Sequence, residues 1–223
     1  MTVNLQEGHR DSPISKKKRN NMLQQLIILA PPFLLAITMH EYAHGYVAWC
    51  LGDPTAQQQG RLTLNPVKHL DPIGVLAFII MKIGWAKPVP VNPAYFKDPV
   101  RGMVWVSLAG PGANFALALA SALVLKLLMF TGSLLPHAIF LPLAKMLAAS
   151  VWINLLLAFF NLIPFPPLDG SKILSGFLPA DLAAMYQKLE PFGFIILLVL
   201  FYLGVLSRII YPLTNYSYNL IAG

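Results

Sequence analysis

One short motif in this sequence has the residue types and the spacing of a catalytic metal site. It is His40-Glu41-Tyr42-Ala43-His44, in which a glutamate directly follows the first of two histidines. Residues i and i+4 of a helix lie on one face, so both imidazoles can bind one Zn²⁺. Glu41 then lies beside the water that the metal activates, where a carboxylate can accept a proton. The motif predicts metal-dependent hydrolysis, and its alternative is a pair of packed or water-bridged histidines.

A catalytic zinc usually has three protein ligands and one open position, so a third ligand is expected elsewhere. Only nine residues are acidic, and Asp169 stands out among them because it follows a long apolar run and a proline-rich stretch. The prolines between residues 164 and 167 end a helix, and Gly170 permits a tight turn that could bring the carboxylate back. By itself an Asp-Gly pair after prolines is more typical of a surface turn. Combined with the histidine pair, Asp169 is the predicted third ligand.

The composition indicates that these residues belong to a membrane protein. Hydrophobic residues make up 57% of the chain and charged residues only 11%, whereas soluble domains carry about 25% charged residues. So few charges cannot coat a globule of this size. A soluble enzyme and a disordered chain are therefore excluded. A disulfide scaffold is excluded as well, because Cys50 is the single cysteine.

Four apolar stretches approach or exceed the roughly 20 residues that cross a bilayer. They are Asn20–Met39 with a continuation to about Leu51, Gly102–Phe130, Ala138–Leu162 and Phe192–Pro212. Pro31-Pro32 predicts that the first helix is kinked or begins there. We therefore predict an all-α polytopic membrane protein with about four transmembrane helices.

The region over residues 52–101 differs from the spans because turn signals interrupt it. Its run Ile73–Ile83 is too short to span a bilayer and favours a re-entrant or surface-lying piece. The alternating residues Arg61–Leu64 and Val89–Val91 predict short strands. We therefore expect a re-entrant region that contains short β-structure.

The net charge of +7 comes from 16 basic and nine acidic residues. Its densest cluster, Lys16–Arg19, precedes the first apolar stretch, which is typical of topology and lipid contact rather than of nucleic-acid binding. That cluster favours a cytoplasmic N-terminus, whereas the more numerous basic residues of the later loops favour cytoplasmic loops. The predicted organisation is a basic segment over 1–21, one membrane-embedded domain over 22–213 and a tail over 214–223.

Several motifs, in this order, resemble the site-2 protease family of intramembrane zinc metalloproteases. They are HEYAHG, GDPTA, GRLTLNPVKHLDPIG, GWAKPVPVN, AGPGANF and NLIPFPPLDG, which together cover roughly Thr38 to Leu178. The resemblance is to compact bacterial-type members that lack a PDZ domain. It implies that His40, His44 and Asp169 bind one zinc ion per chain and that Glu41 is the general base. It also implies hydrolysis of a peptide bond within or next to a substrate's transmembrane segment.

The resemblance extends to further polar positions. The family's residue that matches Asn161 contributes to the active site, and a buried amide there could hold the scissile carbonyl or its oxyanion. Its alternative is an interhelical hydrogen bond. Asn114 matches a Gly-Pro-x-x-Asn motif, and a structural hydrogen bond is the favoured role. His69 and Asp71 resemble part of the re-entrant segment and form either a surface turn or a pair that supports the site.

We therefore expect a zinc endopeptidase of the bacterial plasma membrane that cleaves transmembrane proteins in the lipid bilayer. A regulatory membrane partner is a further expectation, and nucleic acid is not an expected partner. The alternative is a non-proteolytic protein that binds or transports metal at the same site, although transport has no need of Glu41 as a base. A membrane protease of the prenyl-protein type would need a downstream glutamate ligand, and Glu190 lacks a matching context.

Overall fold

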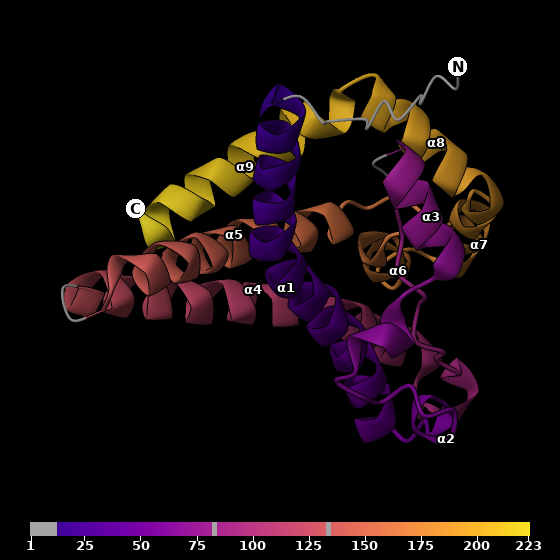
Figure 1. The fold of residues 1–223 in the computed structure, drawn as a ribbon. Helices are drawn as coiled ribbons and strands as arrows, with labels where there is room; N and C mark the ends of the chain where they lie inside the picture. Colours follow the sequence, from indigo (N-terminus) through magenta and orange to yellow (C-terminus); the bar gives the residue numbers. More distant parts are fainter. Residues whose placement is uncertain (1–12, 82–83, 133–134) are drawn as a thin grey trace, which may run out of the picture.

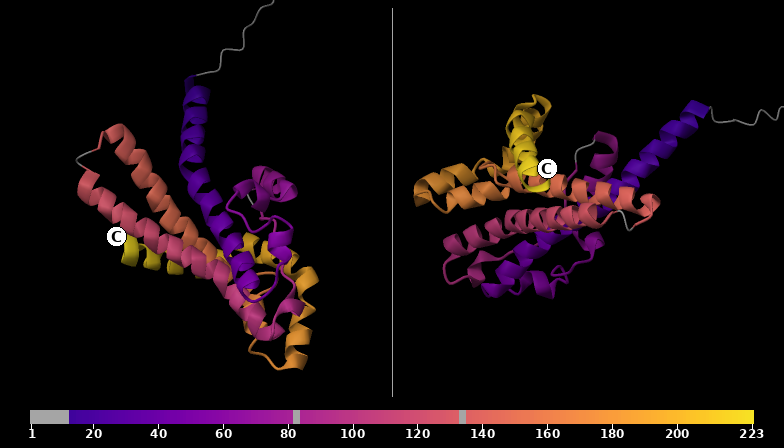
Figure 2. Two further views of the ribbon diagram at one scale, coloured as in Figure 1. Left: turned by 90° about the horizontal axis from the view of Figure 1, so that it is seen from below. Right: turned by 90° about the vertical axis from the view of Figure 1, so that its left-hand side faces the viewer.

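Long helices dominate the computed structural model, which describes residues 13–81, 84–132 and 135–223. The longest are α1 (Pro13–Cys50), α4 (Pro99–Thr131) and α5 (His137–Asn161). All three contain stretches that are long and apolar enough to cross a membrane. Figures 1 and 2 show α4 and α5 side by side, with α1 crossing them. The first three predicted spans are therefore confirmed.

The proline pair does not start the first helix. α1 begins at Pro13, in front of the basic cluster, and continues through Pro31 and Pro32. Figure 1 shows that α1 changes direction part-way along its length. Proline removes one helical hydrogen bond, which a long apolar helix tolerates when neighbouring helices pack against it. Residues 1–12 of the predicted basic segment lie outside the described residues.

The predicted fourth span is wrong, because Gly204 divides residues 192–212. α8 (Glu190–Tyr202) ends before Gly204, whose φ is +72°, and α9 (Val205–Ala222) begins after it. Glycine adopts this left-handed conformation without a steric penalty, so it ends one helix and redirects the next. In the described residues a fourth crossing exists only if α7 (Ala180–Gln187) and α8, bent by 63°, form one span.

Small residues allow the central helices to pack closely. Ala118 and Ala122 of α4 form a buried cluster with Val151 and Leu155 of α5. Small side chains let the helix backbones approach closely. This close packing stabilises helix association in lipid, where burial of apolar surface contributes little free energy. The end of α9 also packs on this cluster through Tyr218 and later residues.

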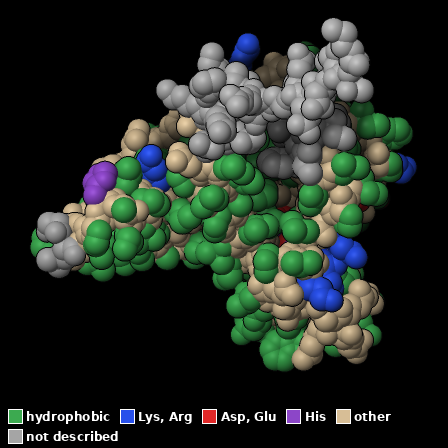
Figure 3. Space-filling view, viewed as in Figure 1, with side chains coloured by type: hydrophobic (Ala, Val, Ile, Leu, Met, Phe, Trp, Pro, Cys, Tyr) green, Lys and Arg blue, Asp and Glu red, His purple; other side chains and the backbone are tan. Residues whose placement is uncertain are grey.

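Large apolar side chains cover much of the outside of the bundle. On the face shown in Figure 3, they extend over α4, α5 and α1 with few charges among them. Leu123, Leu127 and Phe130 of α4, for example, are exposed. Such a surface is unfavourable in water and suits a bilayer.

The region between α1 and α4 consists of turns and short helices. They are α2 (Thr55–Gln58), the 3-10 helix η1 (Pro66–His69), α3 (Pro72–Met81) and the 3-10 helix η2 (Pro93–Tyr95). α3 has ten residues, too few to span a bilayer, and residues 82–83 of the predicted apolar run lie outside the described part of the chain.

The two predicted strands are not formed. The described residues contain no β-strand, only an isolated bridge between Leu70 and Ala86. Pro88 and Pro90 have no N–H groups, so one edge of a strand here would lack these donors, and the N–H of Val89 on the other edge donates to Glu41. Side chains hold this extended segment in place of a neighbouring strand, as described below.

Candidate metal centre

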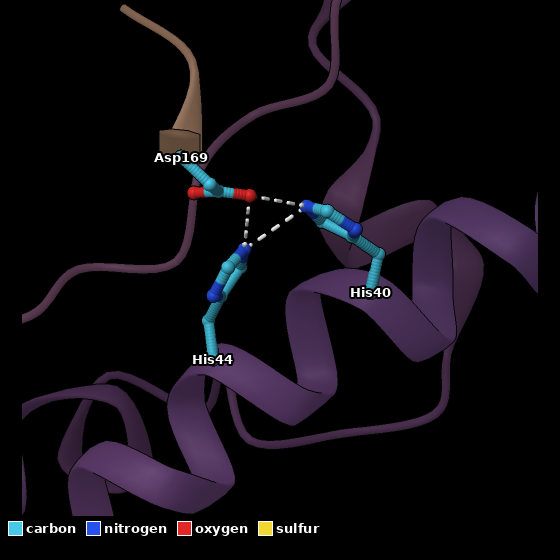
Figure 4. Close-up of side chains that lie close together, drawn as sticks. All are labelled: His40, His44 and Asp169. Atoms are coloured by element: carbon cyan, nitrogen blue, oxygen red, sulfur yellow. Dashed lines mark hydrogen bonds and ion pairs between the residues drawn. The ribbon is translucent and has the colours of Figure 1, made fainter. Parts of the chain in front are cut away.

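His40 and His44 lie one helical turn apart on α1, and both point toward Asp169 (Figure 4). Their Nε2 atoms are 2.9 Å apart. The Oδ2 atom of Asp169 lies 3.1 Å from Nε2 of His40 and 3.2 Å from Nε2 of His44. All three side chains are buried. The structure thus brings together the three residues that the sequence selected as ligands.

Asp169 reaches the histidines because the chain folds back tightly after α5. Asp169 is the first residue of α6 (Asp169–Ser175), and a Cβ atom on Gly170 would lie 2.3 Å from the carbonyl oxygen of Leu162. Only glycine permits this approach of two backbone segments. The Asp-Gly pair is therefore a buried close contact and not the exposed turn that the prolines alone would suggest.

A second glycine leaves room for the imidazoles beside α4. A Cβ atom on Gly110 would lie 2.4 Å from Nε2 of His44 and 2.6 Å from Cε1 of His40. Gly110 was not predicted as a site residue. The signal that could have found it is its place in the AGPGANF motif, on a long helix where glycine is otherwise unfavourable.

Hydrogen bonds determine which nitrogen of each imidazole carries the proton. Nδ1 of His44 lies 2.7 Å from the carbonyl oxygen of Val106, which can only accept, so Nδ1 donates. Nδ1 of His40 lies 2.7 Å from Oδ1 of Asn114. The amide nitrogen of Asn114 donates to the carbonyl oxygen of Ala36, which leaves Oδ1 to accept from His40. In both neutral rings Nε2 therefore presents its lone pair.

Three lone-pair-bearing atoms thus face one another in a buried space, and this arrangement fits a zinc ion. Ligand atoms 2.0–2.2 Å from a tetrahedral zinc lie about 3.3 Å apart, close to the observed separations. Oδ2 of Asp169 is buried without a hydrogen-bond partner. A cation among the three atoms would relieve their mutual repulsion.

Glu41 is held by the extended segment between α3 and α4. Its Oε2 atom accepts a hydrogen bond of 2.8 Å from the backbone N–H of Val89. Arg61 donates to the carbonyl oxygens of Lys87 and Pro88 at 2.8 and 3.2 Å. At the other end of the segment, the Asp53 carboxylate accepts from the N–H of Asn92 at 2.7 Å. The segment that contacts Glu41 is therefore fixed on both sides.

Asp53 and Arg61 were not predicted to support the site, although they lie in the motifs GDPTA and GRLTLNPVKHLDPIG. Both are buried, with exposures of 0% and 7%. A charged side chain that is buried needs a partner that compensates its charge. Because charged residues are scarce in this sequence, each one could have been considered as a buried residue with such a partner.

Two cavities meet beside Glu41. The larger, of about 620 Å³, is mainly apolar and lies among α1, α3, α5 and α8. The smaller, of about 320 Å³, is more polar and is lined by His44, Asp169 and Lys172. His40, Glu41 and Asn161 line both cavities. A bound peptide chain can therefore pass the metal group with an apolar compartment on one side and a polar one on the other.

Comparisons with known proteins agree with this geometry. Residues 136–204 match the description Peptidase family M50. The chain is 42% identical over 182 residues to "Putative zinc metalloprotease YwhC" of Bacillus subtilis (strain 168), covering 82% of this chain and 83% of the relative. The chain belongs to peptidase family M50. It is 29% identical over 202 residues to "Putative zinc metalloprotease Rip2" of Mycolicibacterium smegmatis (strain ATCC 700084 / mc(2)155), covering 86% of this chain and 73% of the relative.

No solved structure matches the chain. Membership of family M50 confirms the resemblance to compact members of the site-2 protease family. The protein is an intramembrane zinc metalloprotease, and zinc is its cofactor. The spanning helices and the family together make it an integral membrane protein.

The remaining predicted residues of this M50 peptidase take different places. Asn161 ends α5 and donates to the carbonyl oxygen of Leu157 on the same helix at 3.0 Å, while its side chain lines both cavities. His69 is fully buried and contacts the carbonyl oxygen of Thr63, and Asp71 caps the start of α3. Among the described residues, neither joins the group of potential metal ligands.

Proposed function

We propose that His40, His44 and Asp169 bind one zinc ion and that Glu41 is the general base of this peptidase. The observation that carries the proposal is the convergence of three buried lone-pair-bearing atoms next to a glutamate held by a backbone N–H. Two imidazoles and one carboxylate form a usual donor set for a catalytic zinc that keeps one open position.

The side chains around this centre divide the remaining work. Zinc, when bound, supplies Lewis-acid activation of water and of the scissile carbonyl. The Glu41 carboxylate accepts a proton from the attacking water and transfers it to the leaving amide nitrogen. The Val89 N–H holds one carboxylate oxygen and leaves the other for the proton. We assign Asn161, which lines both cavities, to binding of the scissile carbonyl or its oxyanion.

The two cavities support a path in which the substrate segment passes from the apolar cavity to the polar one at the bond that is cleaved. Phe33, Ile37 and Phe160 line the larger cavity, which suits the apolar side chains of a transmembrane segment. An intact helix has its carbonyls paired and poorly exposed, so the substrate must unwind locally. Substrates with helix-breaking residues beside the cleaved bond are therefore expected to be preferred.

The setting of the enzyme belongs to the same proposal. We assign residues 22–213 to one membrane-embedded domain, flanked by a basic segment over 1–21 and a tail over 214–223. The bacterial relatives support a bacterial plasma membrane as the location. A membrane protein that regulates access to the site is the proposed further partner.

The test is cleavage of a transmembrane substrate by the purified, zinc-loaded protein in proteoliposomes. Glu41→Gln should keep zinc but lower cleavage about 10²–10⁴-fold, because only the base is lost. Products are identified by mass spectrometry, and bound zinc is measured in the same samples. Cleavage by Glu41→Gln at the wild-type rate would refute the mechanism. Zinc uptake into the vesicles without any cleavage would favour the transport alternative.

A further inference from the structure

A row of buried polar side chains leads from His40 into the bundle, away from both cavities. Oδ1 of Asn114 on α4 lies 2.7 Å from Nδ1 of His40, and Nδ2 of Asn114 donates to Oδ1 of Asn154 on α5 at 2.8 Å. Nδ2 of Asn154 donates in turn to the carbonyl oxygen of Ser150 at 2.8 Å and to its Oγ at 3.3 Å. The row ends at the Oγ atoms of Ser150 and Ser121, 2.8 Å apart.

Each amide in this row has a fixed orientation. Asn154 must turn its nitrogen toward the carbonyl oxygen of Ser150, because a carbonyl can only accept. Its Oδ1 atom therefore faces Asn114 and accepts from it. Asn114 has two acceptors for its nitrogen, the carbonyl oxygen of Ala36 and Oδ1 of Asn154. The amide nitrogens of Asn114 and Asn154 both donate away from His40.

This direction has a consequence for the metal centre. If Asn114 presented its nitrogen to His40, Nδ1 would have to accept, and a neutral ring would then carry its proton on Nε2. Nε2 would have no lone pair for a metal. Asn114 and Asn154 are both fully buried, so bulk water cannot supply the hydrogen bonds that either amide would lose if it were turned the other way. The orientation of Asn154 thus bears on which nitrogen of His40 is free.

We propose that Asn154 is a positioning residue for zinc binding, acting through Asn114 on the tautomer of His40. This rests on the proposed role of His40 as a ligand. Asn154 itself contacts none of the three ligands in the described structure. Its partners are Asn114 and Ser150, so it supports the metal centre from α5 through one intervening side chain.

Ser121 offers a matched control. It is buried at the same interface between α4 and α5 and belongs to the same row, but it lies beyond the amide whose orientation matters. Ser121→Ala leaves the backbone carbonyl of Ser150 in place, so Asn154 keeps its anchor. If the row only stabilises the packing of α4 and α5, changes at Asn154 and at Ser121 should have similar effects on zinc affinity.

The experiment compares zinc dissociation constants of the full-length protein in detergent, by competition with a chelator. Asn154→Leu, which keeps a similar volume, should raise the constant about 10-fold. The zinc concentration for half-maximal peptidase activity should rise by the same factor, while KM at saturating zinc stays unchanged. Ser121→Ala should lower the melting temperature without changing zinc affinity. If Asn154→Leu fails to fold, Asn154→Ala leaves space instead of a clash and is read in the same way.

Wild-type zinc affinity in the folded Asn154 variant would overturn the inference, and so would an equal loss of affinity in Ser121→Ala. His40→Ala separates this failure from a failure of the proposed function. If His40→Ala binds zinc as the wild type does, the ligand assignment is wrong, and the positioning role is overturned with it. If His40→Ala loses zinc while the Asn154 variant does not, only the positioning role is wrong.

Discussion

The helical bundle and the region between α1 and α4 hold two halves of the same site by different means. In the bundle, α1, α4 and the start of α6 bring His40, His44 and Asp169 together through close contacts at glycines. In the other region, turns carry an extended segment to Glu41, and buried charged side chains bind the backbone of that segment. The bundle thus positions the metal ligands and carries Glu41 on α1, and the other region holds the Glu41 carboxylate.

From this division we expect that zinc binding and proton transfer can be disturbed separately in this peptidase. Helix packing holds the positions of side chains within narrow limits, and a metal site requires ligand atoms at such well-defined positions. A segment held by a few hydrogen bonds to its backbone can be disturbed without moving the helices. Changes that displace the proposed ligands in the bundle should therefore remove zinc, whereas changes that displace the segment beside Glu41 should reduce catalysis and leave zinc bound.

The largest effect is expected for Asp169→Ala, which removes one of the three proposed ligands. The two imidazoles alone cannot hold zinc tightly, so bound zinc and peptidase activity should both fall to background. Zinc per chain is measured by atomic emission after gel filtration, together with cleavage of a transmembrane substrate. Asp181→Ala, a change at an exposed carboxylate on α7, is the control and should keep both. Full zinc content in Asp169→Ala would remove Asp169 from the ligand set.

A smaller loss of zinc is expected for Gly110→Ala. The added methyl group would lie 2.4 Å from Nε2 of His44, so α4 or the imidazoles must move. Zinc affinity should fall about 10–100-fold, the range found when groups that orient metal ligands are changed. Chelator competition measures the affinity in detergent.

Gly112→Ala is the control for this change. It lies on the same helix, and a Cβ atom there meets no other atom within 4 Å. Both substitutions gain the same helix propensity, so a difference between them reports the contact with the histidines. Equal zinc affinity in the two variants would show that Gly110 does not control the space around the ligands.

The same two regions differ in how far the sequence predicts them. The HExxH motif, the long apolar runs and Asp169 predicted three spans and the residues that meet at the metal group. Periodicity and the cost of charge in lipid are local properties, so they can be interpreted without knowing the fold. The strands predicted at 61–64 and 89–91 and the span over 192–212 failed because tertiary contacts and one left-handed glycine decide them. Asp53 accepts a hydrogen bond from a distant backbone N–H and Arg61 donates to distant carbonyl oxygens, and such contacts leave no periodic pattern in the sequence.

The smallest effect, and the sharpest test of the division, is expected for Asp53→Ala. Asp53 fixes the end of the segment whose Val89 N–H contacts Glu41, and it touches no proposed ligand. A looser segment should misplace the base and lower kcat about 10-fold, since displacements of about 1 Å at a reacting group cost up to about 10²-fold. Zinc content should remain that of the wild type. Asp98→Ala is the control, because Asp98 caps α4 and pairs with Arg101 at the exposed end of the same region. If Asp53→Ala lost zinc in proportion to activity, the two regions would have to be treated as a single unit. If zinc and kcat respond separately, the base is controlled by a part of the chain that the metal does not need.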